Sequence, residues 1–191
     1  MKIAIIGYKN HSSRLISIIN SLGICNKLVV YHPNKAKLLN GFNEKGLYFE
    51  TVLTDSLDLL LECNCIFITS PTSSHFEYIV KILPKYNGYI FCEKPPCSSS
   101  IEAEKLSSLS ISDKERVYFN FNYRFTELSK LCKKAIAKKV YGRLISMEFY
   151  SSHGMAFQSS YKQNWRNTSS GILENIIGNV VRMRHFHIFL R

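Results

Sequence analysis

The sequence predicts an α/β protein built on a doubly wound parallel sheet, followed by the start of an incomplete α+β second domain. Short apolar segments alternate with longer amphipathic ones over the first two-thirds of the chain. The short segments are continuously apolar, as in strands that are buried on both faces. The segment at 142–154, GRLISMEFYSSHG, instead alternates apolar and polar residues, which is typical of a sheet with one open face.

The predicted strands of the parallel sheet are six short apolar segments. They cover residues 2–7, 27–31, 48–53, 65–70, 89–94 and 116–125. Because crossovers between parallel strands are right-handed, this order gives a Rossmann-like domain. We expect this domain over residues 1–122 and the partial second domain, with the substrate side and its sheet, over residues 123–191.

The helices are predicted from amphipathic spacing and from capping residues. The first follows the pattern at 14–22, with its apolar side formed by Leu15, Ile16, Ile18, Ile19 and Leu22. The others are a short helix at 34–39, a helix at 57–62 capped by Asp55, one capped by Thr72 or Ser73 that runs to Leu83, one that opens at 98–100 and runs to Leu109, and one at 127–138.

The chain has 25 Lys and Arg against 14 Asp and Glu, a net charge of +11. The cations are scattered, and no basic run is longer than two residues. Nucleic-acid-binding surfaces cluster their cations, so we expect no nucleic acid as a partner. A small phosphate-bearing ligand or plain solubility explains the charge as well.

The six cysteines form no C-x-x-C pair, and most lie inside apolar segments. This is typical of reduced, buried thiols in a cytosolic protein, and we expect no metal site. The N-terminal MKIAIIGYKN is interpreted as a strand rather than a signal peptide, and no apolar run is long enough to span a membrane. We therefore expect a cytoplasmic location and no membrane partner.

Ligands of doubly wound sheets bind beyond the carboxyl ends of the strands, so the residues after each strand are the candidates. Gly7, Tyr8 and Lys9 follow the first strand. The dinucleotide-binding pattern has glycine where Lys9 and Ser12 stand, although Ser12 is small enough for close helix packing. Lys9 either crowds a diphosphate or contacts it as a cation.

The residues after the second strand bear on the choice of cofactor. His32 lies where a ribose-binding carboxylate is expected, and Lys35 and Lys37 follow it. Polar and basic groups there favour a 2′-phosphate, which makes NADP slightly preferred over NAD. A solvated turn with two surface lysines is the alternative.

Thr69, Ser70 and Pro71 follow the fourth strand. Their small side chains and the proline make a tight exit against which a ribose or nicotinamide can lie. His75 stands on the first turn of the next helix. It is a candidate for the cofactor side, with packing or capping as the alternative.

Glu93 and Lys94 follow the fifth strand, before Pro95. A lysine fixed at this place can bind a substrate hydroxyl, polarise a carbonyl and take part in proton transfer. An ordinary Glu–Lys pair at a surface turn is the alternative.

Several motifs together resemble the Gfo/Idh/MocA family of NAD(P)-dependent oxidoreductases, which act on sugars, polyols and nucleotide sugars. They are KIAIIG at the N-terminus, ITSPTSSH for the family's T-P-x-x-x-H, FCEKP for its E-K-P, NYRF at 122–125, YGRLISMEF, and a WR…GILEN segment at 165–175. They follow the family's order and spacing over about 175 residues.

The resemblance implies hydride transfer with NAD(P) and a small sugar or nucleotide-sugar substrate. Lys94 corresponds to the E-K-P lysine between nicotinamide and substrate, and Glu93 would orient it. Arg124, His153 and Trp165 would lie in second-domain segments near the substrate.

The chain departs from the family after Ile176, where G-x-H-x-x-D is expected and IGNVVRMRH is found. We hypothesise that residues 177–191 are out of frame, which would leave the second domain incomplete and activity impaired. An unfinished sheet also favours self-association as a homo-oligomer. The alternative is a non-catalytic nucleotide-binding or interaction protein that retains only the Rossmann domain.

Overall fold

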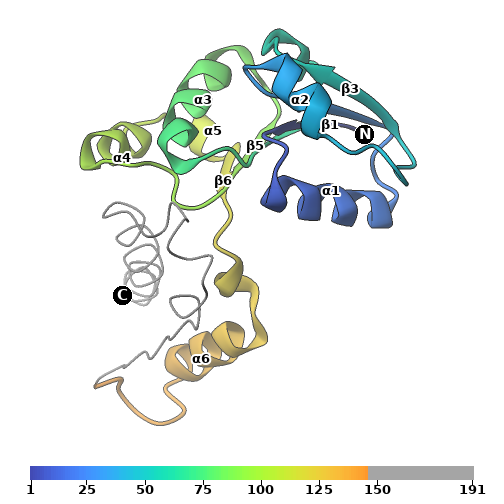
Figure 1. Ribbon diagram of the computed structural model, residues 1–191. Coiled ribbons are helices and arrows are strands. Elements are labelled where there is room, and N and C mark those ends of the chain that lie inside the picture. The colour runs from blue at the N-terminus through green and yellow to red at the C-terminus, as the bar shows by residue number, and fades with distance from the viewer. Residues whose placement is uncertain (146–191) are drawn as a thin grey trace, which may run out of the picture. The chain divides into compact units, whose positions relative to one another are not determined.

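The computed structural model describes residues 1–145. The chain divides into two compact units, Met1–Asn120 and Phe121–Arg191, and each is described by itself. The first unit contains the predicted sheet, and the described part of the second contains a short 3-10 helix and one α-helix (Figure 1).

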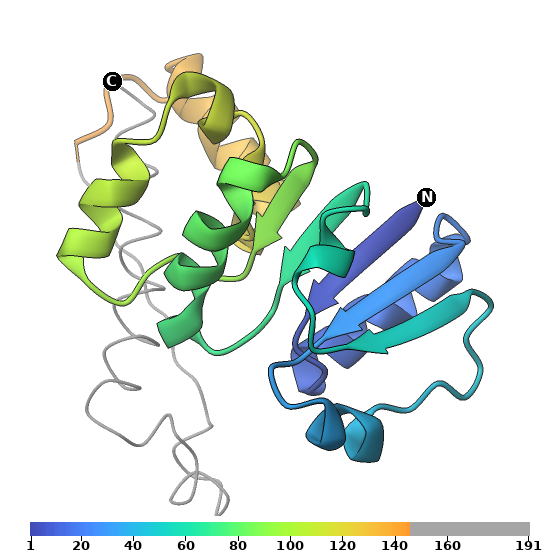
Figure 2. The same cartoon turned by 90° about the horizontal axis from the view of Figure 1, so that it is seen from above.

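The sheet has six strands in the order β3-β2-β1-β4-β5-β6 (Figure 2). Every neighbouring pair is parallel. The strands are β1 Lys2–Ile6, β2 Lys27–Tyr31, β3 Glu50–Thr54, β4 Cys65–Ile68, β5 Tyr89–Cys92 and β6 Val117–Phe119. This order confirms the predicted doubly wound, Rossmann-like fold, because the chain builds outward from β1 on one side and then returns to β1 through β4.

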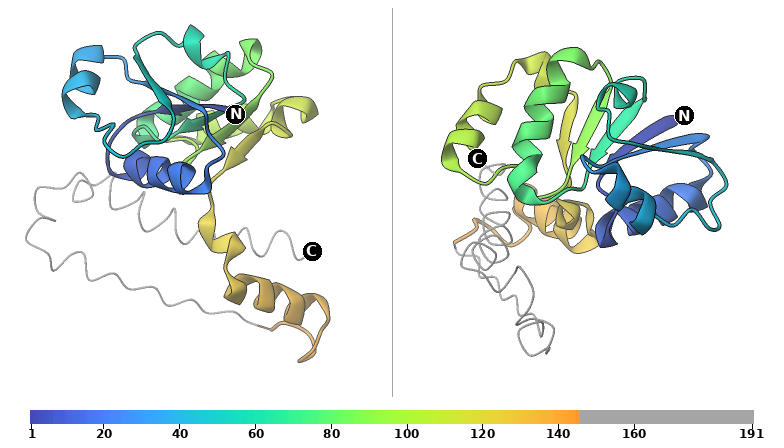
Figure 3. Two further views of the ribbon diagram at one scale, coloured as in Figure 1. Left: turned by 90° about the vertical axis from the view of Figure 1, so that its right-hand side faces the viewer. Right: turned by 45° about the horizontal axis from the view of Figure 1, so that its top comes forward.

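Helices lie on both faces of the sheet (Figure 3). They are α1 Asn10–Leu22, α2 Lys35–Gly41, α3 His75–Ile82, α4 Ser100–Ser107 and α5 Ile111–Lys114. Side chains of α1 and α2 pack with one set of strand residues, and side chains of α3 and α4 pack with the other. The three central strands β1, β2 and β4 are therefore almost wholly apolar, because their successive side chains meet helices on alternate faces of the sheet.

Strand β1 shows this two-sided burial most clearly. Ile3 and Ile5 belong to the core beneath α1, whereas Ala4 and Ile6 belong to the core beneath α3. All four are at most 1% exposed. A strand at the centre of a parallel sheet has no solvent face, and only apolar side chains fit there.

Four predicted elements differ from the structure. Thr72 and Ser73 cap no α-helix, because they lie inside the 3-10 turn Thr72–Ser74 and α3 begins at His75. Ile18 and Leu22 of α1 are exposed, because the helix turns only Ser12, Ile16 and Ile19 fully into the core. Asp55 caps no helix: the segment before β4 forms only the 3-10 turn Asp58–Leu60. The sixth strand ends at Phe119, and the residues Asn122–Phe125 form another 3-10 helix.

The second unit contains helix α6, Glu127–Ala137. Thr126 is its N-cap, and its side chain accepts a hydrogen bond from the Ser129 N–H. The strand predicted at 142–154 lies mostly outside the described residues, and its first four residues are not in a strand. Within residues 1–145, no helix is both long and apolar enough to cross a membrane.

Adjacent isoleucines of α1 provide a test of this packing. Ile19 is 3% exposed and Ile18 is 54% exposed. Ile19→Ala should lower the free energy of unfolding by about 2–5 kcal/mol, because it removes buried methylenes and leaves a cavity. Ile18→Ala, the matched control on the same helix, should change it by about 0.5 kcal/mol or less. Equal losses in urea unfolding would contradict the observed orientation of α1.

Candidate active site

The carboxyl ends of all six parallel strands lie at one edge of the sheet. The strand order reverses between β1 and β4, so the segments after these two strands leave in opposite directions. Such a switch point is where open α/β sheets bind their ligands. The predicted cofactor-side residues lie in the four segments that follow β1, β2, β4 and β5 at this edge.

Gly7 ends β1 with a φ of +106°, a conformation that favours glycine. A Cβ at this position would lie 3.1 Å from the Thr69 Oγ1 and 3.3 Å from the Ser12 Oγ. Those two hydroxyls are 2.8 Å apart, and the Thr69 hydroxyl also donates to the Ile6 carbonyl at 2.8 Å. The turn after β1 is therefore packed directly against the end of β4 with no room for a side chain.

Lys9 is the N-cap of α1 and has extended backbone, with φ −93°. Lysine therefore replaces glycine here without backbone strain. Its Nζ lies 6.0 Å from the centre of the Tyr8 ring. The Tyr8 ring in turn meets the His32 ring edge-on, with the ring centres 5.2 Å apart, so the segments after β1 and β2 are in contact.

The turn after β2 is ordered by hydrogen bonds to its own backbone. The His32 Nδ1 lies 3.0 Å from both the backbone nitrogen and the carbonyl oxygen of Asn34. The Asn34 side chain caps α2 by accepting from the Lys37 N–H. Lys35 and Lys37 are exposed, and no carboxylate stands between residues 32 and 37.

His75 is 1% exposed and connects two turns of the site. Its Nε2 lies 2.7 Å from the Ser70 carbonyl oxygen, and its Nδ1 lies 2.7 Å from the Pro95 carbonyl oxygen. Pro71 separates β4 from the short 3-10 turn Thr72–Ser74. The imidazole thus ties the segment after β4 to the one that follows Lys94, and both of its nitrogens face protein carbonyls.

Glu93 and Lys94 directly follow β5. The Glu93 side chain is 16% exposed, and its Oε1 lies 2.7 Å from the His11 Nε2. The Asn120 side chain, just beyond β6, donates to the same oxygen. The carboxylate is therefore held by groups from α1 and from the end of β6. The surface-turn alternative does not fit this packing, because a free turn would leave Glu93 in solvent.

The charges around Glu93 shift two pKa values in opposite directions. Burial by itself would raise the pKa of Glu93, but the hydrogen bonds from His11 and Asn120 outweigh it and hold this pKa below its usual value. The hydrogen bond to Glu93 raises the pKa of His11, against burial and the positive charges of Arg14 and Lys94. An ionised Glu93 and a protonated His11 therefore stabilise each other.

Sequence patterns did not single out His11 and Asn120. Asn120 directly follows the last strand, but the strand was predicted to run to 125, which placed Asn120 inside it. His11 lies in the first turn of α1 and touches Glu93, 82 positions further along the chain, only after folding. Of the predicted substrate residues, Arg124 is exposed in the second unit, and His153 and Trp165 lie outside the described residues.

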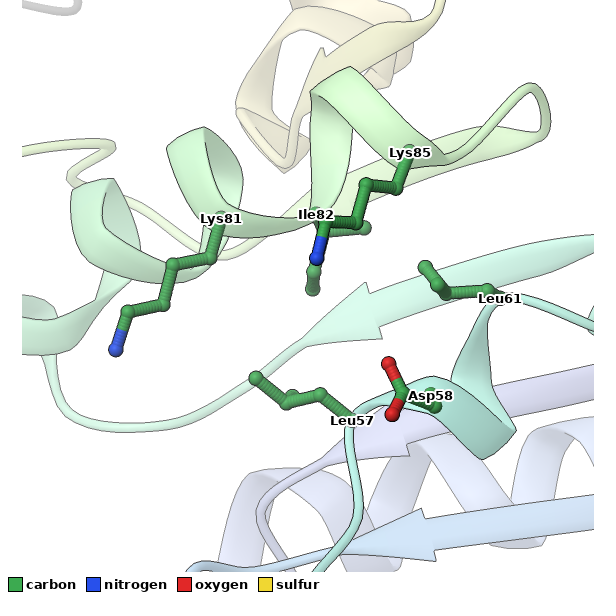
Figure 4. A pocket seen from close by; sticks show the side chains of 6 residues that line it. All are labelled: Leu57, Asp58, Leu61, Lys81, Ile82 and Lys85. Atoms are coloured by element: carbon green, nitrogen blue, oxygen red, sulfur yellow. The ribbon is translucent and has the colours of Figure 1, made fainter.

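The remaining features of the described residues lie apart from this edge. A shallow hollow of about 170 Å³ is lined by Leu57, Asp58, Leu61, Lys81, Ile82 and Lys85 (Figure 4). These residues precede β4 and β5, so the hollow lies at the opposite edge of the sheet from Lys94. Residues 1–145 contain no group of three or more His, Cys, Asp or Glu that could hold a metal ion.

Comparison with known proteins identifies this arrangement. Residues 1–121 match the model of the GFO_IDH_MocA family, described as an oxidoreductase family with an NAD-binding Rossmann fold. No curated protein matches the chain.

Solved structures agree in fold. Myo-inositol 2-dehydrogenase from Lactobacillus plantarum has a TM-score of 0.75 and 20% identity over 97% of this chain and 56% of its own. Scyllo-inositol dehydrogenase from Lactobacillus casei, with bound NAD(H) and scyllo-inositol, has a TM-score of 0.71 and 20% identity over the same shares, 97% and 56%. WlbA dehydrogenase from Bordetella pertussis, in complex with NADH and UDP-GlcNAcA, has a TM-score of 0.59 and 19% identity over 75% of this chain and 44% of its own.

The chain thus spans about half the length of these structures. Their low identity supports the fold alone, whereas the family match covers well over half of this chain. It confirms the resemblance that the motifs indicated: the chain belongs to the Gfo/Idh/MocA oxidoreductase family, with its NAD-binding Rossmann fold.

Proposed function

We propose that this chain holds the nicotinamide dinucleotide and the proton-transfer lysine of an enzyme that moves a hydride to or from a sugar, a polyol or a nucleotide sugar. One observation carries the proposal. Lys94 follows β5 beside the fixed carboxylate of Glu93, at the same sheet edge as Gly7 and Thr69. A turn suited to a dinucleotide and a titratable side chain therefore lie at the same edge of the sheet.

The edge after β1 fits the diphosphate of a dinucleotide. The first turn of α1 has no acidic residue, and the N–H groups of a first turn have no acceptor within their helix. Gly7 keeps the turn free of a side chain, and Tyr8 contacts His32 beside it. The Lys9 side chain lies over Tyr8 beside this turn, and the role we assign to it is contact with a phosphate as a cation.

The segments after β4 and β5 fit the nicotinamide half. Thr69, Ser70 and Pro71 would line the ribose and the ring, with His75 fixing the turn through the Ser70 carbonyl. Bound nicotinamide supplies or accepts the hydride. Lys94 would hold the reacting hydroxyl or carbonyl oxygen and exchange a proton with it. Arg124, His153 and Trp165 are proposed for the substrate side.

The comparisons and the turn after β2 favour different cofactors, NAD and NADP respectively. The family is described as NAD-binding, and similar structures contain NAD(H). The turn after β2 lacks a ribose-binding carboxylate and carries exposed Lys35 and Lys37, which favours NADP. We keep the slight preference for NADP as a prediction.

The cellular location is proposed from the thiols. All six cysteines are free, and burial raises the pKa of Cys63 and of Cys65 to about 11. Thiols that resist ionisation are inert and fit a reducing compartment. This supports the cytoplasm as the location of the protein.

Fluorescence titration of the purified chain with NADPH and NADH in parallel tests the cofactor. Saturable binding of both, tighter for NADPH, is the expected result, since Lys35 and Lys37 would meet the 2′-phosphate. Lys35→Ala combined with Lys37→Ala should remove the preference and leave the affinity for NADH within about twofold, which is less than about 0.5 kcal/mol. Failure of folded protein to bind either nucleotide would contradict the proposed function.

Replacement of Lys94 separates the enzyme from a nucleotide-binding protein without catalysis. Lys94→Ala should slow hydride transfer to or from inositols and nucleotide sugars by about 100-fold or more, the usual contribution of a proton-transfer group. Its NADH affinity should stay close to that of the parent chain.

Lys81→Ala is the control, because Lys81 is exposed on α3 and pairs only with the neighbouring Glu77 among the described ion pairs. Transfer that survives in Lys94→Ala would exclude Lys94 as the proton-transfer group. Tight NADH binding with no transfer by the parent chain would favour the non-catalytic alternative.

A further inference from the structure

His11 belongs to none of the motifs that predicted the candidate site, yet it contacts the Glu93 carboxylate beside Lys94. Its Nε2 lies 2.7 Å from the Glu93 Oε1, and its side chain is 48% exposed. It stands in the first turn of α1, whereas Glu93 follows β5. The pair therefore joins two segments on opposite sides of the switch point between β1 and β4.

The Glu93 Oε1 receives hydrogen bonds from both His11 and Asn120. The carboxylate cannot turn without breaking both, so its charge has a fixed position. The Lys94 N–H, from the next residue, also bonds to the Glu93 carboxylate. Glu93 is thus an oriented anion beside the lysine to which the proposed chemistry is assigned.

Three charged groups act on the His11 imidazole. Glu93 faces it directly, Arg14 lies one turn further along α1, and Lys94 lies on the turn after β5. Glu93 favours the protonated imidazole, and the two cations oppose it. Interaction between two charges is mutual, so a protonated His11 also disfavours the ammonium form of Lys94.

This mutual effect controls how readily Lys94 can lose and regain a proton. A lone carboxylate beside a lysine stabilises the ammonium and makes it a poor source or acceptor of protons. A carboxylate already paired with an imidazolium has little net charge, and its effect on the neighbouring lysine is weaker. The oriented Glu93 can then fix the position of Lys94 without locking its proton in place.

We propose, on the basis of the function proposed above, that His11 is a positioning residue of this site: its protonated imidazole holds Glu93 in place and offsets the carboxylate charge beside Lys94, so that Lys94 can release and regain a proton.

The proton-release property of Lys94 can be measured on the cofactor-free chain. Trace labelling with acetic anhydride modifies only the neutral amine, and peptide mass spectrometry reports the labelling rate of each lysine. In His11→Gln the uncompensated Glu93 should slow labelling of Lys94 at pH 7 by about threefold or more, half a pKa unit being a factor of about three. Glu93→Gln removes both the anion and the partner that keeps His11 charged, so labelling of Lys94 should stay within about twofold of the parent rate. The double variant should return to within about twofold of the parent rate.

The dependence on pH distinguishes this role from simple packing. Glu93 raises the pKa of His11, so the imidazole keeps its charge to a higher pH than a free histidine and loses it as the pH rises through that raised pKa. The difference between His11→Gln and the parent chain should therefore shrink as the pH rises. A purely structural defect would persist at every pH, and that result would overturn the proposal, as would unchanged labelling of Lys94 at pH 7.

Lys81 is the internal control in the same digests, since it pairs with Glu77 far from His11 along the chain. Its labelling should not change in any of the variants, and a parallel change would overturn the proposal by indicating general unfolding. NADH titration of His11→Gln should give an affinity within about threefold of the parent chain. Because labelling needs neither cofactor nor substrate, a chain that binds no dinucleotide would contradict the proposed function and still test His11.

Discussion

The contact between the ends of β1 and β4 is the constraint on which the rest of the site depends. Gly7 turns the chain out of β1 with a positive φ, and the hydroxyls of Ser12 and Thr69 meet beside it. Any side chain at Gly7 would enter this contact at 3.1 Å. The start of α1 is consequently fixed against the end of β4, and the segments that diverge from the two strands lie at the switch point where open α/β sheets bind ligands.

A second group of contacts brings distant segments to this edge. Glu93 follows β5, His11 comes from α1, and Asn120 follows β6, and all three meet at one carboxylate oxygen. His75 similarly joins the carbonyls of Ser70 and Pro95, which follow β4 and β5. Lys94 lies between these two polar connections in the sequence and is half-buried. Its surroundings are therefore set by side chains rather than by the strand alone.

The opposite edge of the sheet and its interior carry no comparable chemistry among the described residues. The hollow lined by Leu57, Asp58 and Lys85 lies where strands begin and contains no constellation of titratable groups around a fixed anion. The buried cysteines fill space in the core, and Cys92 is 0% exposed with its pKa raised by burial. The candidate functional residues thus collect where the parallel strands end, as the topology of such sheets favours.

The sequence by itself determined the fold and the places to look. Short, continuous apolar segments that alternate with amphipathic helices are typical of strands covered on both faces, and Gly7, Thr69 and Lys94 were found by their positions after such strands. Register and burial were harder to predict: Ile18 fits the apolar spacing of α1 but is exposed, because the direction of the helix is set by packing against Ile3 and Ile5.

Only the tertiary structure decided which charges meet. His11 and Glu93 lie 82 positions apart and show no common pattern, and the end of β6 had to be placed at Phe119 before Asn120 could reach the carboxylate. Hydrophobic periodicity is a local property that can be recognised in a short stretch of sequence. A hydrogen bond between two turns forms only after the sheet has aligned the strands that carry those turns.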